Sequence, residues 1–150
     1  MHALLLRLNP LLHNEDLGKL LLRITLGGLI LLHGVNKAAF GLTGIHALLA
    51  AKGLPAFLGY GAYVGELLAP ALIVLGVLVR PSALIMAFTM LFAWYLAHVG
   101  DTFSLTKSGA SAIESLLYYG VSGLALACLG AGNYSLLKTA RSGACPCGGF

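Results

Sequence analysis

The sequence predicts an all-α integral membrane protein: a bundle of four transmembrane helices, with a short interfacial helix between the first two spans. Its composition favours this class, because 59% of the residues are hydrophobic and only 9% are charged, with a mean hydropathy of +0.91. Soluble domains usually carry about 25% charged residues, so this chain has too few charges to coat a soluble globule. The apolar runs are also about 18 or more residues long, which suits the thickness of a bilayer.

The other features of composition exclude competing classes. The net charge of +4 is spread thinly along the chain without a basic patch, which argues against nucleic-acid binding. The first residues are interrupted by Pro10 and lack a small-residue cleavage site, so we expect no cleaved signal peptide. We therefore divide the chain into an amphipathic lead-in over 1–16, a four-helix membrane domain over 17–137 and a flexible cytoplasmic tail over 138–150.

The first two spans follow from helix-start and helix-breaking residues. Asn14 and the two acidic residues after it are suited to the positive end of a helix dipole, and they precede a span predicted over 17–36. The connection over 38–59 is interrupted by glycines and a proline, so we expect its middle, 44–52, to form the short interfacial helix. The second span is predicted over 60–79.

The third and fourth spans complete the bundle. Pro81 suits the first turn of a helix, so a tight turn at this point predicts a third span over 82–99. Trp94 and Tyr95 near its end are typical of an interfacial aromatic belt. The fourth span is predicted over 112–130. Four spans place both termini on one side, and the excess of Lys and Arg there predicts cytoplasmic termini in the cytoplasmic (inner) membrane.

A polar stripe runs along the first span. On an α-helix with about 100° per residue, small and charged residues share one face: Arg23, Gly27, Ile30, Gly34 and Lys37, with His33 at its edge. A charge in hydrocarbon costs roughly 2.5–3.5 kcal/mol on insertion scales, so this face should contact protein or water rather than lipid. The stripe therefore predicts polar partners on the other spans.

Polar residues of the other spans fall at a similar depth. Counting about 1.5 Å per residue places six of them in the outer half of the bundle: His33, Lys37, Glu66, His98, Glu114 and Tyr118. Arg23 lies nearer the inner side and completes the stripe. We predict that these seven residues bind a ligand in one polar chamber that opens outwards, and that Glu66 or Glu114 is the candidate for handling protons.

Pro70 draws attention to Glu66. A proline inside a helix cannot donate to the carbonyl four residues earlier, which here belongs to Glu66. We expect a kink with a free carbonyl beside this carboxylate, and such a site at membrane depth suits a ligand or a proton.

Simpler interpretations of the same residues stay open. Lys37 with either acid can be a purely structural ion pair, His33 a satisfied core histidine, and His98 an interface residue beside the aromatic belt. The spans contain no HxxxH or ExxH spacing, so we predict no metal in the bundle. Cys145 and Cys147 form a close dithiol in the tail, and they are weak candidates for a soft metal or a redox pair.

Several short motifs occur in a fixed order over about residues 17–137. They are Arg23 with Gly27, His33-Gly34 with Lys37, Gly65-Glu66, Gly76 with Arg80, Glu114, and Gly130-Ala131-Gly132 followed by Tyr134-Ser135-Leu136. In this order and spacing the chain resembles the DoxX family of small bacterial and archaeal membrane proteins. It departs from the family pattern at Ala131, where proline is common, and near Leu137 and Lys138, where an acid is common.

The resemblance implies a role beside redox enzymes, since the related DoxD proteins belong to thiosulfate:quinone oxidoreductase. We expect an inner-membrane, redox-associated subunit that binds a quinone or a similar small apolar molecule, and that works as a membrane subunit of a quinone-linked oxidoreductase. The expected partners are the lipid bilayer, a redox protein and a second copy of the chain. Two alternatives stay open: a non-enzymatic membrane partner or assembly protein, and a carrier of small solutes or metal.

Overall fold

The computed structural model describes residues 14–105 and 109–137, which form an all-α fold with a single isolated bridge, Leu105 to Ser111, outside the helices. The predicted lead-in up to residue 13 and the tail over 138–150, which holds the dithiol, lie outside the described residues. These two predictions therefore stay as they stand.

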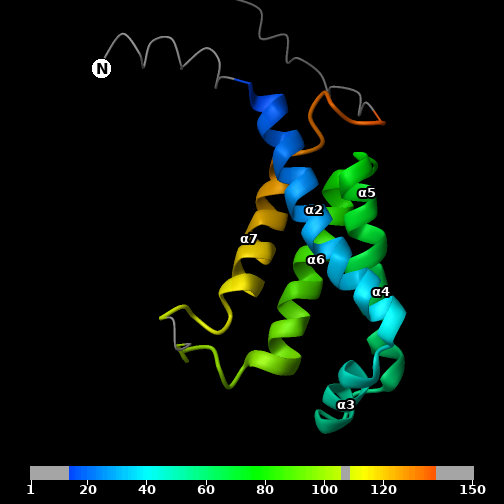
Figure 1. The fold of residues 1–150 in the computed structure, drawn as a ribbon, viewed down its shortest axis with the longest axis vertical. Coiled ribbons are helices and arrows are strands. Elements are labelled where there is room, and N and C mark those ends of the chain that lie inside the picture. The colour runs from blue at the N-terminus through cyan, green and yellow to red at the C-terminus, as the bar shows by residue number, and fades with distance from the viewer. Residues whose placement is uncertain (1–13, 106–108, 138–150) are drawn as a thin grey trace, which may run out of the picture.

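The helix α2 (Glu15–Phe40) extends along the bundle and contacts both the second span and α7 (Figure 1). It begins as its sequence predicts, because the Asn14 side chain accepts a hydrogen bond from the Leu17 amide at 3.0 Å. Lys37 lies in its last turn, where a cation faces the negative end of the helix dipole. The helix thus carries acidic side chains in its first turn and a lysine in its last turn.

A short helix, α3 (Thr43–Ala51), follows at the end of the bundle where α2 stops (Figure 1). Gly41 and Gly53 flank it with φ angles of +85° and +67°, a backbone conformation that glycine adopts without strain. The helix occupies the region in which the sequence predicts one, and its placement in a membrane interface stays a prediction.

The second span is one continuous helical segment of changing pitch. It begins at Ala56 and ends at Leu75, earlier than residue 79, because Gly76 and Leu78 have φ angles of +76° and +47° and turn the chain. Its four parts are the 3₁₀ turn η1 (Ala56–Tyr60), α4 (Gly61–Tyr63), the π-helical turn η2 (Val64–Leu68) and α5 (Ala69–Leu75).

Proline explains the wide turn in this segment. Pro70 has no amide hydrogen for the Glu66 carbonyl, and the preceding Ala69 amide bonds to Val64, five residues back, rather than to a residue four back. The sequence predicts a kink at this point, and the structure forms a π-helical turn that contains Glu66.

Two further helices complete the described fold. The third, α6 (Val79–Ala93), continues into a second π-helical turn, η3 (Trp94–His98), and α7 (Glu114–Leu129) packs beside α6. Three segments of the described chain are long and apolar enough to cross a membrane: Glu15–Phe40, Ala56–Leu75 and Val79–His98. Because α7 is apolar but shorter, the count of four spans stays a prediction.

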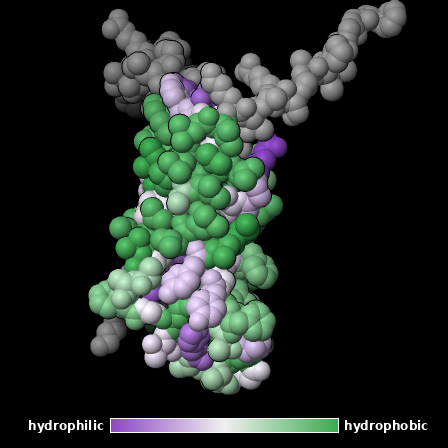
Figure 2. Space-filling view, turned by 90° about the vertical axis from the view of Figure 1, so that its right-hand side faces the viewer, coloured by the Kyte–Doolittle hydropathy of each residue, from purple (hydrophilic) through white to green (hydrophobic). Residues whose placement is uncertain are grey.

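The molecule has a narrow core and an apolar outside. Its core consists of Leu26, Ile30, Ile73, Val79, Ala83, Met86, Met90 and Leu126. Many large apolar side chains point outwards, among them Leu32 and Leu21, which are 68% and 58% exposed. Figure 2 shows hydrophobic residues over most of one face, with hydrophilic ones gathered towards its ends. An apolar surface of this extent suits contact with lipid rather than water.

Two glycines bring α2 very close to the second span. A Cβ atom added at Gly34 would lie only 2.1 Å from the Glu66 carbonyl oxygen, and one at Gly27 would lie 2.8 Å from the Val74 side chain. Small residues at helix contacts allow backbones to approach, which is how apolar helices associate without a hydrophobic driving force. The backbone of α2 therefore rests directly on η2 and α5.

We expect Gly34→Ala to lower the melting temperature of the protein in mild detergent, because a methyl group has no room against the Glu66 peptide. Overpacking of this kind costs about 1–3 kcal/mol. Gly28→Ala is the matched control, since a Cβ there meets nothing within 4 Å. Equal melting temperatures for the two variants would contradict the close contact.

Candidate functional site

A cavity of about 690 Å³ lies among α2, α3, the second span, α6, η3 and α7. Most of its wall is apolar, with contributions from Ile30, Leu48, Phe88, Phe92 and Leu96. Polar side chains line part of the wall: His33, Lys37, Glu66, Thr89, His98, Ser115 and Tyr119. The cavity therefore combines a large apolar space with a small set of polar groups.

An ion pair between Lys37 and Glu66 joins α2 to η2 at the edge of this cavity. Lys37 Nζ binds Glu66 Oε1, and the carboxylate is almost fully enclosed, since Glu66 is only 4% exposed. The second oxygen, Oε2, is buried and has no hydrogen-bond partner among the described residues. The pair thus leaves one acceptor of the carboxylate unused.

Two histidines line the same cavity in different ways. His98 ends η3, and its Nδ1 atom is buried without a hydrogen-bond partner in the described chain. His33, on α2, is exposed, and its ring packs edge-on against Tyr119 of α7 with the centroids 6.4 Å apart. Both rings are positioned to contact a molecule in the cavity.

The structure brings together four of the seven residues predicted to bind a ligand. His33, Lys37, Glu66 and His98 line the cavity, whereas Glu114 and Tyr118 are exposed and lie outside its lining. The residues that follow these two on α7, Ser115 and Tyr119, line it instead. A functional role for any of these side chains stays a prediction.

Arg23 lies apart from the cavity lining and is surrounded by backbone carbonyls. It is 1% exposed, and its Nε and Nη2 atoms donate to Ile73 and Val74 at 2.9 and 3.0 Å. Its Nη1 atom donates to Ala131 and Tyr134, both at 2.7 Å. Carbonyls at the C-terminal end of a helix carry partial negative charge, so the end of α5 stabilises this cation. Arg23 therefore fastens α2 to α5 and to the segment after α7.

Gly76 makes room for the guanidinium, since a Cβ there would lie 2.4 Å from Arg23 Nη2.

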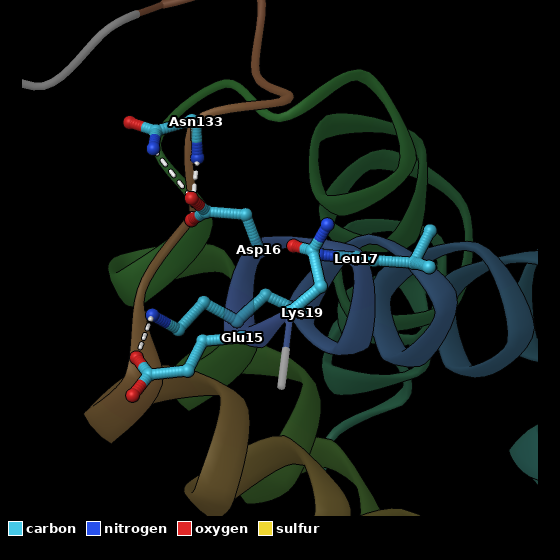
Figure 3. A network of polar contacts seen from close by, with 6 residues as sticks. Glu15, Asp16, Leu17, Lys19 and Asn133 are labelled. Atoms are coloured by element: carbon cyan, nitrogen blue, oxygen red, sulfur yellow. Dashed lines mark hydrogen bonds and ion pairs between the residues drawn. The ribbon is translucent and has the colours of Figure 1, made fainter. Parts of the chain in front are cut away.

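A second contact joins α2 to the segment after α7 (Figure 3). Asn133 donates its amide hydrogen to Asp16 Oδ1 at 3.0 Å, and its side-chain nitrogen binds the other oxygen of the same carboxylate. Lys19 and Glu15 pair nearby at 3.3 Å. This end of the bundle is thus held by polar contacts to α2.

One polar residue of this region is not among those that the sequence predicts for the site. His46, on α3, packs on Gly59 and lies edge-on to Tyr60, with ring centroids 6.0 Å apart, and its Nε2 atom is buried without a partner in the described chain. Its neighbours Ile45 and Leu48 line the cavity. No local pattern marks His46, because its burial depends on how α3 folds back against η1.

Within residues 14–105 and 109–137, no group of three or more His, Cys, Asp or Glu side chains is placed to hold a metal ion. The weak metal candidates Cys145 and Cys147 lie outside this part of the chain.

The fold and the cavity define a class: an apolar helical bundle of the membrane type, with a buried ion pair beside an apolar cavity. The model of the DoxX family matches residues 18–99, more than half of the chain, and covers Arg23, Lys37 and Glu66. The chain belongs to the DoxX family and is a membrane protein, which confirms the resemblance inferred from its motifs. No curated protein and no solved structure matches it.

Replacing Lys37 by Met should strongly destabilise the protein, because it leaves the Glu66 carboxylate buried without its cation. Breaking a fully buried ion pair costs about 3–5 kcal/mol, and the loss here should be smaller because one third of the Lys37 side chain is exposed. The double variant Lys37→Met with Glu66→Leu should recover most of the loss, as measured by unfolding in mild detergent.

The matched control is Lys19→Met, which breaks the surface pair with Glu15. The Glu15 carboxylate is at the surface, with 79% of the side chain exposed, and a surface pair of this spacing is worth only about 0.3–0.5 kcal/mol. If Lys37→Met and Lys19→Met have the same small effect, Glu66 does not depend on Lys37.

Arg23→Lys should also lower the melting temperature, although it keeps the charge. A lysine ammonium is a compact point charge and does not reach carbonyls of two separate segments as the forked guanidinium does. Each buried carbonyl that loses its donor costs about 1–3 kcal/mol. Arg80→Lys, at an exposed position, is the control and should behave as the wild type. An unchanged melting temperature for Arg23→Lys would refute the fastening role.

Proposed function

We propose that this DoxX-family membrane protein binds a small apolar molecule with a polar head, of the quinone class, in the cavity beside Lys37 and Glu66. The observation that supports this proposal is the form of the cavity, whose wall is mostly apolar with one buried ion pair at its edge. Ligand sites for small molecules are typically apolar clefts of about 300–1,000 Å³ with a few placed polar groups.

The arrangement suits an amphipathic ligand for simple chemical reasons. Side chains such as Ile30, Leu48 and Phe92 provide an apolar wall for a ring and its substituents. Lys37 provides a cationic donor for the polar head, and Glu66 holds the ammonium in place. Lys37 is partly exposed, with one third of its side chain accessible, so a head group can reach the ammonium while Glu66 stays enclosed.

The wider setting is part of the same proposal. We take α7 as the fourth span of a bundle in the cytoplasmic membrane, with both termini in the cytoplasm. The family relationship supports association with a redox enzyme, for which the bound quinone is the shared cofactor or substrate. Glu66 is then the candidate for proton exchange at the site.

A larger side chain that obstructs the cavity tests the proposed binding of the small molecule. Ala93 is half buried and lines the cavity, so Ala93→Phe should obstruct it without touching the ion pair. We expect protein purified in mild detergent and incubated with decylubiquinone to retain the molecule in native mass spectra, and occupancy to fall at least tenfold in Ala93→Phe.

The matched control is Ala125→Phe, the same change at an exposed position of α7 outside the cavity lining. It should retain the molecule. Absence of binding to the wild type, or equal occupancy in Ala93→Phe, would overturn the proposed site.

A further inference from the structure

We propose that the apolar tail of the ligand lies in a second cavity, between α6 and α7, so that the site takes a ring with a long hydrocarbon tail rather than the ring alone. This inference rests on the proposed function, which places only the head and the ring in the cavity beside Lys37 and Glu66. It follows from the form of the second cavity and from the side chains that the two cavities share.

The second cavity, which we call the tail groove, has a volume of about 560 Å³ and lies along α6 and α7. Its wall is formed mainly by Leu84, Leu91, Leu117, Gly120, Val121 and Leu124. The part of α6 that lines it, from Leu84 to Trp94, is about 15 Å long. The groove is therefore long enough to hold an extended chain of several carbon atoms.

The polar side chains of the tail groove already have partners. Trp94 and Thr102 line the groove, and Trp94 Nε1 donates to the Thr102 hydroxyl at 3.1 Å. That hydroxyl donates in turn to the Val99 carbonyl at 2.9 Å. Every other described side chain that lines the groove is apolar. The groove thus suits a hydrocarbon chain, which has no polar atom to satisfy.

The tail groove forms because α7 packs less closely on α6 towards its own first turn. A Cβ atom added at Gly123 would lie 2.9 Å from the Met86 side chain and 3.2 Å from the Ala83 carbonyl oxygen. About one turn earlier, a Cβ at Gly120 would have its nearest described neighbour, the Met90 side chain, at 3.8 Å, an ordinary van der Waals distance. Gly120 therefore leaves space between the two helices that is closed at Gly123.

The two cavities meet at three side chains that line both of them: Phe88, Met90 and Leu116. Met90 of α6 belongs to the core, and Leu116 of α7 packs against that core. Methionine is unbranched and has three rotatable bonds, so it adapts its shape readily to a neighbour. A tail attached to a ring in the first cavity therefore has only these side chains to displace before it reaches the groove.

The tail of a bound ligand suits the groove better than the chain of a bilayer lipid. Thr102 and Ile113, from the loop between η3 and α7, line the groove at its loop end. A lipid whose head group lies at that interface would have to pass this loop, whereas a tail from the first cavity enters beside Met90. Hydrocarbon is as well solvated by lipid as by apolar side chains, so the gain in affinity comes from packing and is modest.

Two probes separate the contribution of the tail from that of the ring: decylubiquinone, and its analogue with a methyl group in place of the decyl tail. Both rings are fully substituted and leave no position for attack by the cysteine thiols. Dissociation constants are measured by equilibrium dialysis with the full chain in nanodiscs, and each variant is compared with the wild type for the same probe. Partition into the bilayer is the same in both samples and cancels in this ratio.

Gly120→Leu should fill the tail groove and leave the first cavity open, because Gly120 lines only the groove. We expect the dissociation constant of decylubiquinone to rise at least fivefold and that of the methyl analogue to stay unchanged. Gly28→Leu is the matched control, since a Cβ there meets nothing within 4 Å and Gly28 lines neither cavity. It should bind both probes as the wild type does.

A photoreactive probe locates the tail without any variant and so decides the question if Gly120→Leu does not fold. Decylubiquinone with a diazirine at the end of its tail is irradiated with the wild type, and the labelled residues are mapped by mass spectrometry. We expect labels on groove residues such as Leu91 and Leu124 that excess decylubiquinone removes. Labels confined to the lipid, or to Val64 and Ile85 of the first cavity, would overturn the proposal.

The outcomes separate this inference from the proposed function. Equal weakening of both probes in Gly120→Leu, or no weakening of either, overturns the placement of the tail and leaves the proposed site in place. If only decylubiquinone binds the wild type measurably, the labelled positions decide. If neither probe binds the wild type above empty nanodiscs, the proposed function fails, and this inference fails with it.

Discussion

The contact between Gly34 of α2 and the Glu66 peptide is the constraint on which the arrangement of the cavity depends. Any side chain at Gly34 would collide with the Glu66 carbonyl, so the two backbones lie as close as they can. This proximity brings Lys37, about one turn further along α2, to the Glu66 carboxylate. Pro70 adds the π-helical turn that holds Glu66, because its missing amide disrupts the regular helix. Gly34 and Pro70, neither of which has a polar side chain, therefore determine where the charge of Glu66 lies.

The bundle accommodates its buried charges in two different ways. Arg23 has carbonyl partners rather than a carboxylate, and these come from the end of α5 and from the segment after α7. All three of its nitrogen atoms donate, in four hydrogen bonds, so the guanidinium stabilises the fold. Glu66 has Lys37 on one oxygen, and its other oxygen has no partner among the described residues. A buried acceptor without a donor is unfavourable, so Glu66 contributes less to the stability of the bundle than Arg23 does.

The sequence predicts the helices and the buried polar residues better than it predicts their directions. Apolar runs and the Asn14 cap locate α2, and the depth count places His33, Lys37, Glu66 and His98 near one another, as the cavity lining shows. On α7, the sequence points to the acid Glu114 and the residue one turn later, whereas Ser115 and Tyr119 line the cavity. The packing of α7 on α6 determines which face of α7 points to the cavity. Gly123, one turn beyond Tyr119, rests on Ala83 and Met86 of α6. Local periodicity in the sequence does not predict tertiary contacts of this kind.

The cavity is also where the local rules of helix geometry and hydrogen bonding fail. Regular α-helix and complete hydrogen bonding both favour stability, and most of this bundle obeys them. The two π-helical turns lie at the cavity, and so do Glu66 and His98, which carry two of the three buried polar side-chain atoms without a partner in the described chain. A chain that only needed a stable bundle would gain by replacing Glu66 and Lys37 with apolar residues, since buried ion pairs rarely outperform packed hydrophobic side chains. Stability of the fold alone therefore does not explain the Lys37–Glu66 pair, and the proposed binding site would give the pair a role.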